Sequence, residues 1–188
     1  MNATQPSPYQ KPDLHRSWLT PREFDFELYT DGSGHPDLFG GAAVYGLSTK
    51  YRKQFTRASA FYGADTDRAE FEALLAGLQG ILDTMEWNSH LWKGLLEARR
   101  CTVFWLSDRE SLVGSVCRDD KTGQPIYRRR NCPDLWARFA YYENLFDVQG
   151  VHRERNTHPF QKIADGISSE CRTMMKNYFA ILEQEQSK

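Results

Sequence analysis

Alternating and continuous hydrophobic runs divide the chain into strands and helices joined by short polar breaks. Three runs near the beginning alternate apolar and polar positions and are rich in aromatic residues, which is typical of an antiparallel β-meander. Apolar residues at helical spacing predict amphipathic helices, and the continuous run CTVFWLS is typical of a buried strand. The predicted strands cover residues 24–30, 40–48, 51–61, 101–107 and 146–154, and the predicted helices cover 67–85, 109–117, 134–145 and 161–184.

The order β-β-β-α-β-α-α-β-α predicts an α/β domain, built on a mixed sheet with helices on its faces. Thr66 or Asp67 is the expected N-cap of the first helix, and Asp134 that of the third. Residues 1–22 are rich in Pro, Ser, Gln and Asn, which predicts a flexible tail. Residues 23–188 contain no internal repeat, so we expect them to form one domain.

Composition and charge exclude several classes of protein. The 188 residues are 40% hydrophobic and carry a net charge of −1, so binding to nucleic acid would need local basic patches. The four cysteines have no zinc-ligand spacing, which favours reduced thiols and a cytoplasmic location. No apolar run reaches the roughly 20 residues that span a bilayer. We therefore expect a monomeric cytoplasmic protein without membrane contact.

Acidic residues recur along the chain at the ends of predicted strands and near the starts of predicted helices. Asp31 follows the first predicted strand and Asp108 follows the fourth. Glu70 and Asp165 lie near the starts of the first and last helices. Central strands of such a sheet end at a shared edge, where ligands bind. Four converging acids would repel one another unless divalent cations lay between them, and oxygen ligands favour Mg²⁺ or Mn²⁺.

Each acid also has an ordinary structural interpretation. Asp31 could form a turn, Glu70 could lie beside Glu72 on a solvated helix surface, and Asp165 could interact with the helix dipole. Asp108 could be the N-cap of the helix that follows it. The joint placement of all four, at two strand ends and two helix starts, favours the metal site.

Five segments resemble motifs of ribonuclease H type I (ribonuclease HI). YTDGSG is similar to the family's first-strand motif, TDRAEFEALLAGL to its first-helix motif with Arg-x-Glu, and WLSD to its third acidic motif. NCPDLWARF resembles the family's non-catalytic Asp-Leu-Trp helix, and HPFQKIAD its final His-Pro loop with the fourth acid. The resemblance covers residues 24–175, with the motifs in order and at fitting spacings.

The resemblance implies a ribonuclease H-like fold, with a five-stranded mixed sheet of three antiparallel strands plus two parallel ones. It also implies an endoribonuclease that hydrolyses the RNA strand of RNA–DNA hybrids with two Mg²⁺ ions, for which Mn²⁺ can substitute. Asp31 would bridge the ions, and Glu70 and Asp108 would complete the shell. Asp165 would hold the ion on the water side. The expected products carry a 5′-phosphate and a 3′-hydroxyl.

A loop histidine before the last acid is expected to assist proton transfer or product release. His158 precedes Pro159, as in the family's His-Pro pair, whereas His152 suits the histidine that follows the last strand. The loop between them is longer than the family pattern, so both histidines are candidates, and the His-Pro pair favours His158.

Substrate contacts are expected at three places. Gly32 and Ser33 let the backbone approach a ligand closely, and Thr66 and Arg68 lie around the first-helix motif. A basic segment next to Tyr127 is the third place, and an arginine run beside an aromatic residue suits phosphate contacts. The arginines of this basic patch are Arg128, Arg129 and Arg130.

Two acids depart from the family pattern near these contacts. Asp67 stands where family members often have Asn, and Glu110 follows Arg109 where a polar amide is common. Extra acid in a nucleic-acid groove weakens phosphate binding. Two alternatives therefore remain beside hybrid cleavage: a nuclease of the same fold that acts on double-stranded or structured RNA, and a non-catalytic nucleic-acid-binding module.

Overall fold

The structure is a computed structural model, and it describes residues 23–34, 39–63, 65–86, 101–119, 122–129, 131–155 and 157–186. The predicted tail, residues 1–22, lies outside the described part of the chain, and so does Arg130 of the basic patch. The division into a tail and one domain therefore stays a prediction. Among the described helices, none combines the length and the hydropathy needed to cross a membrane.

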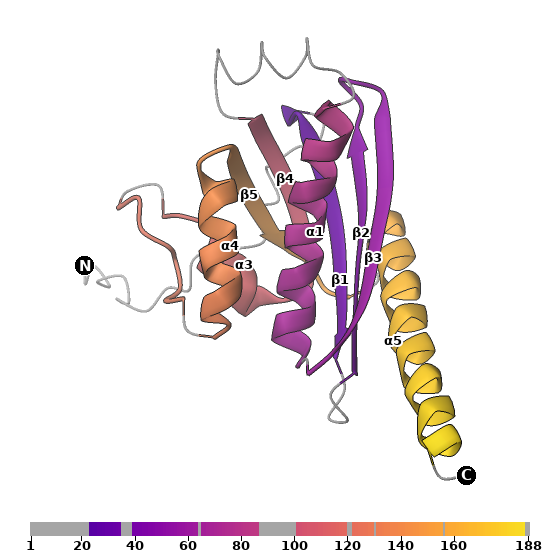
Figure 1. The fold of residues 1–188 in the computed structure, drawn as a ribbon. Helices are drawn as coiled ribbons and strands as arrows, with labels where there is room; N and C mark the ends of the chain where they lie inside the picture. Colours follow the sequence, from indigo (N-terminus) through magenta and orange to yellow (C-terminus); the bar gives the residue numbers. More distant parts are fainter. Residues whose placement is uncertain are drawn as a thin grey trace, which may run out of the picture.

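Five strands form one mixed sheet in the order β3-β2-β1-β4-β5 (Figure 1). The first three are antiparallel neighbours, whereas β4 pairs in parallel with both β1 and β5, which confirms the predicted fold class. The strands are β1 (Phe26–Gly34), β2 (Phe39–Ser48), β3 (Lys53–Tyr62), β4 (Cys101–Ser107) and β5 (Phe146–His152). The helices are α1 (Thr66–Glu86), α3 (Glu110–Val116), α4 (Pro133–Glu143) and α5 (Pro159–Gln186).

Helices cover both faces of the sheet. α1, α3 and α4 lie on one face, and α5 crosses the other face over β1, β2 and β3 (Figure 1). Side chains of β4 alternate between the two layers, as the pleat of a strand requires. Val103 and Trp105 enter the larger core with α1, whereas Phe104 and Leu106 enter a smaller core that Phe160 of α5 also contacts.

The first strand is longer than its hydrophobic pattern predicts. β1 continues to Gly34 and stays paired with β2 over its whole second half. Asp31 therefore lies inside a strand and not after it, although it lies beyond the last β1–β4 pair, Tyr29 with Leu106. The pattern missed this extension because small and polar residues follow Thr30.

The N-cap of the first helix lies before both predicted residues. Asp65, and not Thr66 or Asp67, caps α1, because its carboxylate accepts the backbone N–H of Arg68 at 2.7 Å. The carbonyl oxygen of Asp65 also accepts the first helical bond, from Ala69.

The cap of α4 also differs from the prediction. Cys132 is the N-cap in place of Asp134, because Pro133 takes the first helical position. A proline suits that position, since it has no N–H to leave unpaired and its φ is already helical. Cys132 itself has a φ of 55°, in the left-handed region.

Candidate active site

The sheet register places two predicted acids side by side. β1 and β4 run parallel, and their ladder ends with Tyr29 opposite Leu106. Asp31 and Asp108 each lie two residues further along, so both acids are at the edge where the two strands part. The prediction that Asp108 directly follows a buried strand is confirmed, because β4 ends at Ser107.

Asp108 does not cap the helix that follows it. The N-cap of α3 is Arg109, and its carbonyl oxygen accepts the backbone N–H of Leu112 at 3.1 Å. The alternative interpretation of Asp108 as a capping residue is therefore wrong, and its half-exposed carboxylate is available to the site.

Asp31 is buried, and α5 holds it from its own side of the sheet. The Ser168 hydroxyl donates a hydrogen bond to Asp31 Oδ2. α5 packs so closely that a Cβ at Gly41 of β2 would lie 2.0 Å from the carbonyl oxygen of Ser168. Sequence reasoning missed Ser168, whose only signal is its position one helical turn after Asp165.

α1 carries Glu70 to the same place from the other face. The backbone N–H of Gly32 donates to Glu70 Oε1 at 2.9 Å, and Ser107 Oγ lies 3.3 Å from Oε2. A Cβ at position 32 would lie 2.1 Å from the Glu70 nitrogen, so α1 reaches β1 only because this residue is glycine. Gly32 thus positions a predicted catalytic acid, and its contact with substrate stays a prediction.

Asp31, Glu70 and Asp108 each offer a carboxylate oxygen, and these atoms lie within 4.8 Å of one another. Burial raises the pKa of Asp31, and it raises the pKa of Glu70 well above the usual carboxyl range. The neighbouring carboxylates raise both pKa values further. A divalent cation would relieve this repulsion, and an all-oxygen donor set suits a hard cation. The buried acidic cluster is consistent with use of a divalent metal.

The raised pKa values predict how stability depends on pH without metal. A carboxyl group with a raised pKa binds its proton more tightly in the folded state than in the unfolded state. The stability that this contributes is full below the unfolded carboxyl pKa, near 4, and is lost as the pH rises through the folded pKa. In EDTA, we expect Glu70→Gln to melt above the wild type at pH 8, with a difference that shrinks on acidification. A difference that does not change with pH would contradict the shifted pKa.

Asp165 lies near the acidic cluster but pairs with an arginine. Arg155 donates to Asp165 Oδ1 through Nε at 3.1 Å and also through Nη2. The charge of Asp165 raises the pKa of Asp31, and that of Arg155 lowers it. The structure therefore brings three of the four predicted acids together, places the fourth nearby, and adds a cation that sequence reasoning missed. Metal binding by Asp165 stays a prediction.

The two candidate histidines lie in different surroundings. His152 ends β5, and its Nε2 lies 3.2 Å from the carbonyl oxygen of Asp108. His158 stacks on Tyr29 with ring centroids 4.5 Å apart, and its Nδ1 accepts the backbone N–H of Phe160. Burial lowers the pKa of His158. These contacts place His152 beside an acid of the site and the half-buried His158 against Tyr29 of the smaller core, and a catalytic role for either stays a prediction.

Two of the predicted substrate-binding arginines make intramolecular ion pairs. Arg68 donates to both carboxylate oxygens of Asp134, at 2.6 and 3.2 Å, and so joins α1 to α4. Arg129 pairs with Glu143, and its guanidinium lies 4.5 Å from the ring centroid of Trp136. Both side chains therefore stabilise the packing of α4.

Arg128 differs from its neighbour. It is exposed, and it has no hydrogen-bond or ion-pair partner among the described residues. Arg128 is thus the described arginine of the basic patch that is open to a ligand. Ser33 is buried in β1 and Thr66 is half-buried at the start of α1, and their contacts with substrate stay predictions.

Both acids that depart from the family pattern have partners. Asp67 pairs with Arg109 at 2.5 Å, and Glu110 accepts a hydrogen bond from the Tyr127 hydroxyl at 3.1 Å. The cation that follows Asp108 therefore neutralises Asp67. Asp67 therefore adds less negative charge to the groove than the sequence indicated, whereas the Tyr127 hydroxyl, a neutral donor, leaves the charge of Glu110 in place.

No protein-family model matches the sequence, and no curated protein matches it either. Solved structures do match. LC11-RNase H1, which was isolated from compost and solved in complex with an RNA/DNA hybrid, has a TM-score of 0.60 at 17% identity over 80% of this chain and 98% of its own. RNase H1 from Halobacterium salinarum has a TM-score of 0.51 at 20% identity, over 78% of this chain and 96% of its own.

A third similar structure is the foamy viral protease-reverse transcriptase in complex with an RNA/DNA hybrid. Its TM-score is 0.54 at 13% identity, over 92% of this chain and 22% of that protein. At these identities the likeness shows the fold, and the described chain has the ribonuclease H fold.

Proposed function

We propose that this protein is a ribonuclease H of type I, an endonuclease that hydrolyses the RNA strand of RNA–DNA hybrids. The observation that carries the proposal is the convergence of Asp31, Glu70 and Asp108 from two strands and a helix. Two similar structures, LC11-RNase H1 and the foamy viral enzyme, were solved with RNA/DNA hybrids, which supports the choice of substrate. A module without chemistry would have little reason to hold three repelling acids together.

Two Mg²⁺ ions bound by these carboxylates would activate a water and stabilise the leaving 3′-oxygen, which gives 5′-phosphate and 3′-hydroxyl ends. Groups of the protein itself fix the positions of two of these carboxylates. Ser168 holds one oxygen of Asp31, and Gly32 fixes Glu70 through a backbone N–H, so neither carboxylate has to reorganise during the reaction. Asp108 is half-exposed, so a bound substrate would be able to approach it.

Charged groups around the acids complete the proposed mechanism. Arg155 neutralises Asp165 when the site holds no metal. If a cation took the place of Arg155 beside Asp165, the arginine would be free to contact a phosphate. His152 lies at the Asp108 end of the site, with its Nε2 3.2 Å from the carbonyl oxygen of Asp108. We therefore assign proton transfer or product release to His152 in preference to His158.

A panel of matched, end-labelled substrates tests the function. We expect purified protein with Mg²⁺ to cut the RNA strand of an RNA–DNA hybrid, and to leave DNA–DNA and single strands intact. Asp31→Asn, purified in parallel, controls for a contaminating nuclease. Cleavage of RNA–RNA in preference to the hybrid would instead support the alternative nuclease, and binding without cleavage would support the non-catalytic module.

The histidines give a separate prediction. We expect His152→Ala to lower turnover about a hundredfold, which is within the usual range for general acid–base catalysis, while metal binding is retained. His158→Ala should mainly lower the melting temperature, because it loses the Tyr29 stack and the hydrogen bond to Phe160. Turnover and thermal melting of both variants separate the two roles. A larger loss of turnover in His158→Ala would move the catalytic role to that residue.

A further inference from the structure

α5 lies very close to the sheet beside the acidic cluster. It crosses the face formed by β1, β2 and β3 (Figure 1). Gly41 of β2 pairs with Ser33 of β1, two residues beyond Asp31. A Cβ at Gly41 would lie 2.0 Å from the carbonyl oxygen of Ser168 and 2.9 Å from the nitrogen of Arg172, so only glycine lets α5 come this near. The backbone of the helix therefore meets the sheet at the level of the acids.

One buried hydroxyl group spans this contact. Ser168 is fully buried, and its hydroxyl donates to Asp31 Oδ2. The carbonyl oxygen of Asp165 lies 3.0 Å from the same Oγ. A hydroxyl has one proton, and we assign it to the charged acceptor, because a hydrogen bond to a carboxylate is stronger than one to a neutral carbonyl. Ser168 therefore contacts two of the four predicted acids, the side chain of one and the backbone of the other.

The position of Ser168 in α5 links these two acids. Asp165 and Ser168 lie three residues apart, which is about one turn of a rigid helix. A bond that fixes Ser168 to Asp31 consequently fixes this turn of α5, and with it the backbone of Asp165, relative to β1. The two carboxylates are close enough that the charge of Asp165 raises the pKa of Asp31. Their spacing therefore depends on a third residue.

The bond to Ser168 leaves Asp31 able to hold a cation. An ionised carboxylate has about four lone-pair sites on its two oxygens, and this hydrogen bond occupies one of them. Outer hydrogen bonds of this kind orient carboxylates that bind metal, and their loss typically weakens metal binding about 10- to 100-fold. The contact can therefore persist when the acidic cluster binds a metal.

We propose that Ser168 is a positioning residue, which sets the distance between Asp31 and Asp165 and thereby raises the affinity of the acidic site for a divalent cation. This inference rests on the proposed function, in which Asp165 joins the other acids as a metal ligand. It goes further, because it assigns the spacing of two acids to one hydroxyl of α5. A serine with a purely structural role would contribute to stability alone.

Binding of Mn²⁺ to the substrate-free protein tests this role without cleavage. Bound and free Mn²⁺ are distinguished by electron paramagnetic resonance, and each variant is also melted in EDTA. We expect Ser168→Ala to lower the affinity for Mn²⁺ about tenfold, at the lower end of the range for such contacts. Asp31→Asn, which removes a proposed ligand, should lower it further. Wild-type affinity in either variant would overturn the proposal.

Two substitutions control for a general loss of stability. Ser48→Ala removes another buried hydroxyl, which donates to a backbone carbonyl oxygen at the other end of β2. Phe179→Ala loosens α5 at its contacts with Phe39 and Tyr62 and retains Ser168. Both variants should melt below the wild type and bind Mn²⁺ with wild-type affinity. If either weakens Mn²⁺ binding as much as Ser168→Ala does, the serine acts through stability and the proposal is wrong.

A double-mutant cycle tests the link to Asp165. Asp165→Asn should lower the affinity for Mn²⁺, and its effect should be at least about threefold smaller in Ser168→Ala, where the spacing is already lost. The release of Arg155 from residue 165 occurs in both backgrounds and cancels. Equal effects of Asp165→Asn in the two backgrounds would overturn the assignment of the spacing to Ser168.

The same measurements separate this inference from the nuclease function. If Mn²⁺ binding depends on Ser168 as described, but the protein cuts no substrate of the panel, the nuclease function alone is contradicted. If the protein cuts hybrids and Ser168→Ala binds Mn²⁺ like the wild type, only the role of Ser168 is contradicted.

Discussion

Asp31→Asn is expected to abolish cleavage while it stabilises the metal-free fold. Asp31 accepts a hydrogen bond from Ser168 on α5 and lies with Glu70 and Asp108 in the acidic cluster. Loss of its charge should remove metal-dependent stabilisation of the transition state, and we expect turnover to fall at least about a thousandfold. The asparagine oxygen can still accept the Ser168 hydrogen bond, so the local packing survives.

The gain in stability follows from the raised pKa of Asp31. The buried, ionised carboxylate disfavours the folded state at neutral pH, and the neutral amide does not. Asp147→Asn is the matched control, because it removes the same charge from an exposed position on β5. Cleavage kinetics at saturating Mg²⁺ and thermal melting in EDTA check both parts. Wild-type turnover in Asp31→Asn would remove this residue from the site.

The fold and the position of most acids could be predicted because they follow from local patterns. The alternation in β1 and the continuous apolar run of β4 identify the strands, and the βαβ rule makes β4 parallel to β1. Parallel register then brings Asp31 beside Asp108 without any side-chain detail. The helical spacing of α1 similarly leaves Glu70 on the face that meets Gly32. These steps use hydrophobic periodicity and a general rule of sheet topology, and both can be applied to a single sequence.

The partners of charged side chains could not be predicted in this way. Arg129 and Arg128 are adjacent in the sequence, yet one stacks on Trp136 and the other has no partner among the described residues. Arg155 pairs with Asp165 across a loop whose path no local pattern specifies. The hydrogen bond from Ser168 to Asp31 joins residues on elements that meet only in the folded chain. Such contacts depend on tertiary geometry, and residue type alone does not encode them.

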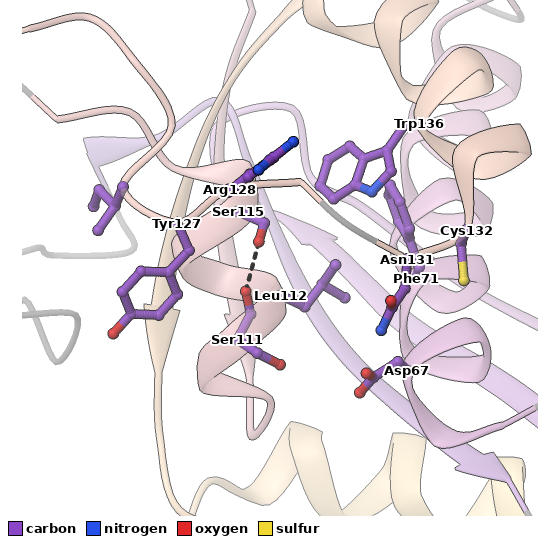
Figure 2. Close-up of a pocket in the computed structure, with 11 residues that line it drawn as sticks. Asp67, Phe71, Ser111, Leu112, Ser115, Tyr127, Arg128, Asn131, Cys132 and Trp136 are labelled. Carbon is purple, nitrogen blue, oxygen red and sulfur yellow. Dashed lines mark hydrogen bonds between the residues drawn. The ribbon is translucent and has the colours of Figure 1, made fainter.

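The same distinction applies to a cavity between α1, α3 and α4. Phe71 is buried in the larger core, and the half-buried Trp136 packs against that core. Residues of α1, α3 and the segment before α4 together line the cavity (Figure 2), which side-chain periodicity does not report. A pocket is therefore visible only when the distances between elements are known.

Gly32→Ala is expected to produce the largest loss of stability of the substitutions considered. The added Cβ would lie 2.1 Å from the backbone nitrogen of Glu70 and 2.4 Å from the carbonyl carbon of Ala69. Both are backbone atoms of α1 and cannot rotate away, so the whole helix has to move from β1. We expect the free energy of unfolding to fall by about 3 kcal/mol, the upper range for overpacking. Turnover should fall as well, because the N–H that fixes Glu70 moves with the strand.

Gly166→Ala is the matched control for this prediction. Residue 166 lies in α5, and a Cβ there meets no atom within 4 Å. Alanine should therefore stabilise the helix by up to about 1 kcal/mol, the difference in helix propensity between the two residues. Urea unfolding of both variants, followed by circular dichroism, measures the two free energies of unfolding. If Gly32→Ala unfolds at the wild-type urea concentration, α1 does not pack against β1 as closely as the hydrogen bond from Gly32 to Glu70 requires, and the positioning of Glu70 must have another cause.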